Sequence, residues 1–78
     1  MEEHSAQAVI IVELISRLYV IDKKIGTYCG HVIKNNGIIA KTTAGTVYLP
    51  LKLIKKQLAS PDSITDDDLL TVISTFSH

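Results

Sequence analysis

Residues 5–21 read SAQAVIIVELISRLYVI, and this stretch decides the fold that the sequence predicts. Ser5 suits the N-cap of a helix, and Glu13 and Arg17 are spaced i, i+4 in the order that favours an ion pair. Glu13, Ser16 and Arg17 share one arc of about 100° on a helical wheel, and every other position after residue 7 is apolar. We therefore predict a helix over 5–21. Two short strands, AVIIV and RLYVI, are the alternative because β-branched residues favour strands.

The apolar arc of this helix is wider than one small sheet can cover. A helix that is apolar nearly all round must be buried nearly all round. In a chain of 78 residues, that burial calls for a second copy or another protein. We therefore predict a homodimer whose interface is formed by Ile11, Leu14, Ile15 and Leu18.

Residues 27–50 predict a three-stranded antiparallel meander. The first strand is TYCGHVIK, and the turn Asn35-Asn36-Gly37 follows it, since Asn and Gly tolerate the positive φ of tight primed turns. GIIAKT and TVYLP are the next two strands, joined by Thr43-Ala44-Gly45. Pro50 ends the third strand because proline cannot donate to a sheet ladder.

Two short helices are predicted after the meander. Pro50 suits the first position of a helix over 51–59, in which Leu51, Ile54 and Leu58 share an apolar face opposite three lysines. Thr65 then precedes DDD and an apolar i, i+3, i+4, i+7 pattern, which indicates a capping box and a helix over 66–76. A strand, LLTVISTF, is the alternative for this last segment because Thr, Val and Ser are poor helix formers. The predicted class is α+β, in one domain spanning residues 1–78.

From its composition we expect the chain to be cytoplasmic. Cys29 is the single cysteine, so no intrachain disulfide is possible and a reducing compartment is expected. The N-terminal MEEHSAQ is acidic, unlike the basic start of a signal peptide. No uncharged apolar run approaches the roughly 20 residues of a membrane-spanning helix.

Charge is segregated along a chain whose net charge is zero. Residues 22–57 carry seven lysines against Asp22 alone, a net charge of +6. Residues 1–21 carry a net charge of −2, and residues 58–78 carry −4. Such segregation can mark a nucleic-acid-binding face, or each element can simply have a solvated side.

The sequence offers no pattern for catalysis, a metal or a cofactor. Nucleophile-elbow, phosphate-loop and dinucleotide-binding motifs are missing. Cys29 and His31 would share a strand face, but two ligands do not make a metal site. The triple aspartate at 66–68 fits the start of a capped helix better than a calcium loop. We expect a protein that is not an enzyme and binds neither metal nor cofactor.

The string AKTTAGTVYLPLKLIKKQL resembles the swapped-hairpin, AbrB-like family of DNA-binding domains. The resemblance runs over residues 41–58 and rests on a basic residue, a glycine turn, a strand, a Leu-Pro corner and a basic helical turn. The matching residues are Lys41, Gly45, Val47, Leu49-Pro50, Lys52, Lys55, Lys56 and Leu58. Members of that family are typically intertwined dimers that bind duplex DNA, which implies a transcriptional regulator or antitoxin. The chain departs from the family by having no arginine in this segment and by continuing with SPDSITDDD.

We therefore expect a small nucleic-acid-binding regulator that works as a homodimer, with duplex DNA as its partner. Its contacts would come from Lys34, Lys41, Lys52, Lys55 and Lys56, which would touch phosphates rather than read bases. The alternatives are a protein-protein interaction module, such as an antitoxin, adaptor or phage-type inhibitor that uses the N-terminal helix, and a small structural or assembly subunit.

Overall fold

The computed structural model describes the backbone of residues 2–78 and the side chains from residue 8 onward. The elements in chain order are α1 (Glu2–Ile21), η1 (Lys23–Ile25), β1 (Tyr28–Lys34), β2 (Gly37–Thr42), β3 (Thr46–Pro50), α2 (Leu51–Ala59), η2 (Pro61–Ser63) and α3 (Asp66–Ile73). The α+β class and the predicted element order are confirmed. The last segment is a helix, so the strand alternative for LLTVISTF is wrong.

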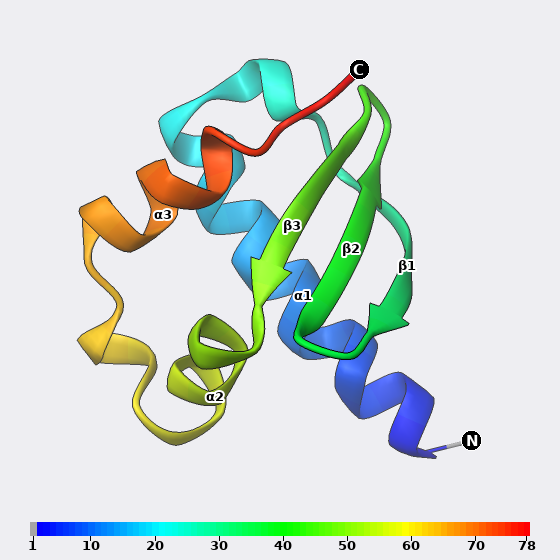
Figure 1. The fold of residues 1–78 in the computed structure, drawn as a ribbon, viewed down its shortest axis with the longest axis vertical. Coiled ribbons are helices and arrows are strands. Elements are labelled where there is room, and N and C mark those ends of the chain that lie inside the picture. Colours follow the sequence, from blue (N-terminus) through cyan, green and yellow to red (C-terminus); the bar gives the residue numbers. More distant parts are fainter. Residues whose placement is uncertain (1) are drawn as a thin grey trace.

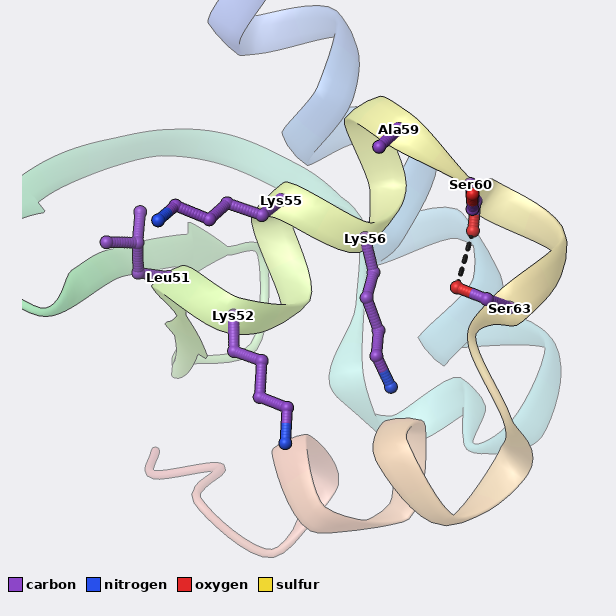
Figure 2. Close-up of a pocket in the computed structure, with 7 residues that line it drawn as sticks. All are labelled: Leu51, Lys52, Lys55, Lys56, Ala59, Ser60 and Ser63. Atoms are coloured by element: carbon purple, nitrogen blue, oxygen red, sulfur yellow. Dashed lines mark hydrogen bonds between the residues drawn. The ribbon is translucent and has the colours of Figure 1, made fainter.

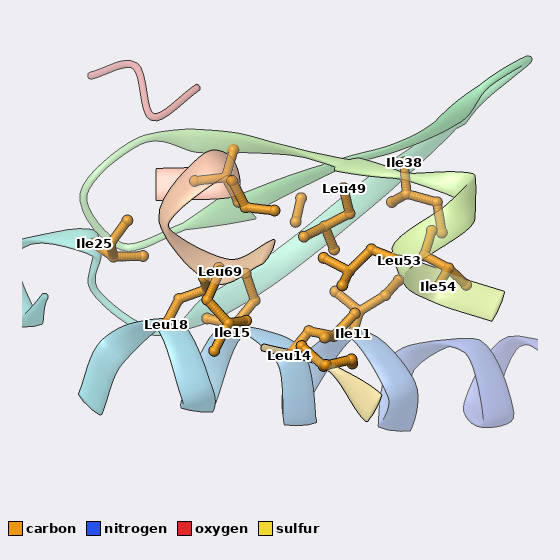
Figure 3. Packing of buried hydrophobic residues seen from close by; sticks show 14 residues of the cluster. Ile11, Leu14, Ile15, Leu18, Ile25, Ile38, Leu49, Leu53, Ile54 and Leu69 are labelled. Atoms are coloured by element: carbon orange, nitrogen blue, oxygen red, sulfur yellow. The ribbon is translucent and has the colours of Figure 1, made fainter. Parts of the chain in front are cut away.

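Helix α1 crosses one face of the sheet, and α2 and α3 close the side of the same layer (Figures 1 and 3). It is one continuous helix, so the two-strand alternative is wrong. It begins at Glu2, three residues before the predicted N-cap, and Ser5 lies inside it. The polar arc is exposed as predicted at Glu13 and Ser16, whereas Arg17 is half-buried.

The predicted dimer residues Ile11, Leu14, Ile15 and Leu18 belong instead to the core of the single chain. None of the four is more than 1% exposed, because the sheet, α2 and α3 pack against this face of α1 (Figure 3). Their assignment to an interface between two chains is therefore wrong. The surplus apolar surface of α1 lies elsewhere, at Val9, Val12, Val20 and Ile21, which remain exposed.

The sheet has the order β1-β2-β3 with both pairs antiparallel. Lys34 pairs with Gly37, so β1 and β2 are joined by the two-residue turn Asn35-Asn36. This turn forms without positive φ at either asparagine, unlike the primed turn predicted. Within the described chain Gly26, just before β1, is the residue that takes a positive φ (+84°), a conformation that suits glycine.

The free edge of β3 is covered by the end of the chain. Thr46 and Ser77 exchange two backbone hydrogen bonds, with N···O distances of 2.7 and 2.9 Å. The next outward N–H, that of Tyr48, donates to Oγ1 of Thr75 at 2.9 Å. Pro50 has no N–H to offer. Every outward donor position of β3 is therefore bonded or missing.

The buried face of helix α2 shares only Ile54 with the face that the sequence predicted. Leu53, Ile54 and Gln57 point into the structure, whereas Leu51 and Leu58 are 43% and 63% exposed. Pro50 occupies the N-cap rather than the first helical position predicted for it. A polar residue can be buried here because Gln57 is hydrogen-bonded to α1: its Oε1 accepts from Arg17 at 3.2 Å and its Nε2 faces Glu13 at 3.5 Å.

Helix α3 begins with the predicted capping box. Oγ1 of Thr65 accepts from the N–H of Asp68 at 3.2 Å, and Oδ2 of Asp68 accepts from the N–H of Thr65 at 3.1 Å. Nζ of Lys56 also donates to Oδ2 of Asp68 at 3.1 Å. The Thr65 N–H, and after it Lys56, holds the pKa of Asp68 below its ordinary value.

This lowered pKa gives a pH-dependent contribution to stability. The contribution is fully present above the ordinary carboxylate pKa and is lost as the pH falls through the lower pKa of the folded state, that is, below about pH 4. Urea midpoints of the wild type and Asp68→Asn should therefore differ at pH 7 and converge as the pH falls through the lowered pKa of Asp68. Asp67→Asn, in the same helical turn, serves as the control. A difference for Asp68→Asn that stays constant with pH would contradict this assignment.

Candidate nucleic-acid interface

The five lysines predicted to contact nucleic acid fall on two elements of the fold. Lys34 and Lys41 belong to the sheet, at the end of β1 and within β2. Lys52, Lys55 and Lys56 belong to α2. All are exposed except Lys56, which is partly buried against α3.

Lys34 and Lys41 lie on the same face of the sheet, which we call the outer face. Ile38, Ala40 and Thr42 of β2 are buried toward α1, so Lys41 points the other way. Gly37 lies four residues before Lys41 on β2 and therefore faces the same way. Lys34 pairs with Gly37, so its side chain is also on this face. No helix covers this face in the two views of the fold (Figures 1 and 3).

The outer face carries no carboxylate of its own. The sequence contains no Asp or Glu between Lys23 and Pro61, a stretch that includes all three strands. The uncharged side chains that surround the two lysines are Val32, Ile39, Thr46 and Tyr48. The positive charge here is therefore free of close opposing charge from the sheet itself.

The lysines of α2 border an open groove of about 510 Å³ between this helix and η2. Figure 2 shows that Lys55 reaches along the helix toward Leu51, whereas Lys52 and Lys56 both point toward α3. Lys56 is neutralised by Asp68, and both residues line a second hollow beside Lys52. The predicted set of five thus loses Lys56, because the acidic start of α3 folds against the basic helix.

A hydrogen-bonded corner joins the two lysine groups. The carbonyl oxygen of Asn36 accepts from the N–H of Leu51 at 2.9 Å and from the hydroxyl of Tyr48 at 2.8 Å. The β1–β2 turn, next to Lys34, is therefore fixed to the first turn of α2, which carries Lys52. Sequence reasoning missed the role of Tyr48. The alternation of Val47 and Leu49 toward the core could have placed it on the outer face.

Two further chemistry-bearing residues, Cys29 and His31, lie on β1. Nδ1 of His31 lies 2.8 Å from the hydroxyl of Tyr28, and Cys29 is an exposed free thiol. No three His, Cys, Asp or Glu side chains gather as metal ligands among residues 8–78. His4 lies outside the described side chains.

Neither α1 nor any other described helix is long and apolar enough to span a bilayer. No known protein family, curated protein or solved structure matches this chain. The site must therefore be interpreted from its own geometry.

Proposed function

We propose that the protein binds the phosphate backbone of nucleic acid through the outer face of its sheet. Lys34 and Lys41 make the central contacts, and Lys52 and Lys55 extend the surface along α2. The supporting observation is an uncovered sheet face with two exposed lysines and no carboxylate from Lys23 to Pro61. Phosphate binding by lysine releases counterions, so the affinity falls steeply with salt.

Contacts of this kind hold the protein on the phosphate backbone and carry little information about base sequence. The surface has no arginine, the side chain that pairs best with guanine, and its one ring, that of Tyr48, is fixed through its hydroxyl to the Asn36 carbonyl. We therefore propose a non-enzymatic regulator of duplex DNA with modest sequence preference. The resemblance of residues 41–58 to AbrB-like domains supports the same class, and it stays a prediction.

The test is fluorescence anisotropy of a labelled mixed-sequence duplex, titrated with protein at several salt concentrations. Replacing Lys34 and Lys41 together by Gln should weaken binding at low salt and reduce the slope of log affinity against log salt by roughly 2. Lys23→Gln/Lys24→Gln, on the turn after α1, is the matched control because it removes the same charge away from the outer face.

Two outcomes would reject the outer face. One is that the wild-type protein shows no binding even at low salt. The other is an equal loss of DNA affinity in the control and in the outer-face variant. That result would mean that the lysines act only through the overall charge of the protein. Lys52→Gln/Lys55→Gln then reports the contribution of α2. Lys56 is left unchanged because it pairs with Asp68 at the start of α3.

A protein-protein interaction module is the second candidate function. Its supporting observation is a stripe of exposed valines on the outward side of α1, interleaved with Ser16 and Glu13, where Val9 and Val20 are 58% and 77% exposed. A groove of about 410 Å³ runs between this stripe and the residues that lead into β1, with Val12, Tyr19 and Tyr28 among its lining. This candidate predicts that Val12→Asp/Val20→Asp abolishes the activity of the protein in cells while DNA binding is unaffected.

A further inference from the structure

The two edges of the sheet differ in how much of their backbone is satisfied. The β3 edge is occupied by Thr75 and Ser77. The β1 edge has no strand beside it in the described chain. Its residues 31–34 are exposed or half-exposed, with Val32 at 39% and Ile33 at 59%. An apolar edge strand with free backbone groups is a template for pairing with another chain.

The register identifies which groups of β1 are free. A two-residue hairpin is closed by a hydrogen-bonded pair, here Lys34 and Gly37. Val32 is therefore bonded to Ile39 across the ladder, and His31 and Ile33 direct their N–H and C=O groups outward. The same alternation on β2 and β3 correctly places Thr46 and Tyr48 at the outer edge, where their N–H groups meet the end of the chain.

We propose that β1 pairs antiparallel with β1 of a second copy, with Val32 on the two-fold axis. His31 then faces Ile33 of the second copy, and Ile33 faces its His31, which gives four N–H···O=C bonds between matched donors and acceptors. The two Val32 side chains meet at the axis as a β-branched pair. Lys34 faces Gly30, so no like charges lie opposite each other. The result is a continuous six-stranded sheet.

The occupant is a second copy because this strand complements itself and only one edge is open. Pairing through β1 leaves just the two covered β3 edges, so it stops at two copies. Four hydrogen bonds alone make a small interface, and a stable one buries more than roughly 1,000 Å². The additional apolar area is at hand, since the groove that ends at Tyr28 joins the exposed stripe of α1 to the start of this strand.

The dimer also concentrates the lysines of the outer face, a consequence that rests on the proposed function. Lys41 lies across from Gly30, and Gly30 would lie across from Lys34 of the second copy. The four lysines then form two parallel rows around the Val32 pair. A Cβ at Gly30 would meet nothing within 4 Å, so the space between the lysines of each row is open.

Cysteine cross-linking of the full chain tests the register. In a Cys29→Ser background, Val32→Cys places two thiols at a non-hydrogen-bonded pair whose Cα atoms are about 4.5 Å apart, within disulfide reach. Ile33→Cys is the matched control. Ile33 is more exposed than Val32. The Cα atoms of residue 33 in the two copies would nevertheless be about 8 Å apart, which is too far for a disulfide. Mild oxidation should therefore convert most of the Val32→Cys protein, and little of the Ile33→Cys protein, to covalent dimer.

Sedimentation equilibrium of the wild type completes the test. The expected result is a reversible dimer, which Val32→Lys shifts to monomer by placing like charges on the axis. Ile39→Lys adds the same charge to the same face one strand away, and it should leave the dimer intact. A strictly monomeric wild type, or equal cross-linking at 32 and 33, would overturn the proposal. A dimer that does not bind DNA would reject the proposed function alone, and a monomer that binds DNA would reject this inference alone.

Discussion

Replacing Leu14 with alanine should lower the free energy of unfolding by about 2–5 kcal/mol, the usual range for a buried leucine. A chain of 78 residues has roughly 4–12 kcal/mol in total, so this one change removes a large fraction of it. Leu14 is 0% exposed and belongs to the cluster of buried side chains that packs on α1 (Figure 3). The loss combines lost apolar burial with the cavity that remains, because neighbouring side chains relax only in part.

Urea unfolding, monitored by circular dichroism, measures this effect. Repeating it at several protein concentrations distinguishes a core residue from an interface residue. If Leu14 belongs to the core of one chain, the penalty is the same at low and high protein concentration. A penalty that disappears on dilution would place Leu14 in an interface between chains and contradict the structure. Val20→Ala is the control on the same helix. It should change stability by less than about 0.5 kcal/mol because Val20 is 77% exposed.

Replacing Thr42 with valine should have the second-largest effect, a loss of about 2–4 kcal/mol. Thr42 is only 8% exposed, and its hydroxyl joins the end of η1 to the β2–β3 turn. The hydroxyl donates to the carbonyl of Ile25 at 2.6 Å and accepts from the N–H groups of Ala44 and Gly45 at 3.1 and 3.0 Å. Valine keeps the shape and leaves these groups without a partner, at about 1 kcal/mol or more for each.

Thr71→Val is the matched control for this substitution. Its hydroxyl donates to the carbonyl of Asp67 on an exposed helical face, where water can replace it. Urea unfolding of the two variants should therefore differ by about 2 kcal/mol or more. Equal, small losses would mean that solvent reaches the β2–β3 turn and satisfies the freed backbone groups.

The sequence predicts most elements of this fold because their signals are local. The Thr65 and Asp68 pair starts α3 through side-chain hydrogen bonds three residues apart, and the Asn35-Asn36 turn follows from residues that favour turns. The alternation in β2 and β3 separates a core face from an outer face. Each of these features depends on near neighbours in the chain.

The wrong predictions concern which elements pack against each helix face. The periodicity of the sequence carries no information about this packing. A helical wheel shows that α1 has a wide apolar arc. It does not show that Ile11 and Leu18 meet their own sheet while Val20 is left exposed. The buried face of α2 includes the polar Gln57, which accepts a hydrogen bond from Arg17, forty residues away in the sequence.

The candidate site shows the same division. Lys34 and Lys41 are on one face because strands alternate, which can be predicted from their spacing and the turn between them. The pairing of Lys56 with Asp68, twelve residues later, depends on how α3 folds back on α2. The basic middle segment and the acidic C-terminal segment, which are separate along the chain, are therefore joined by this ion pair in the folded protein.

The covered edge of β3 has a consequence for the way this protein can aggregate. Cross-β fibrils grow by adding strands at both free edges of a sheet, and β-branched segments such as those of β1 and β2 are suited to such growth. Here Pro50 and the residues from Thr75 to Ser77 leave one edge without a bonding site for an incoming strand. Addition at β1 then uses up the last free edge, so fibril growth first requires the tail to detach from β3.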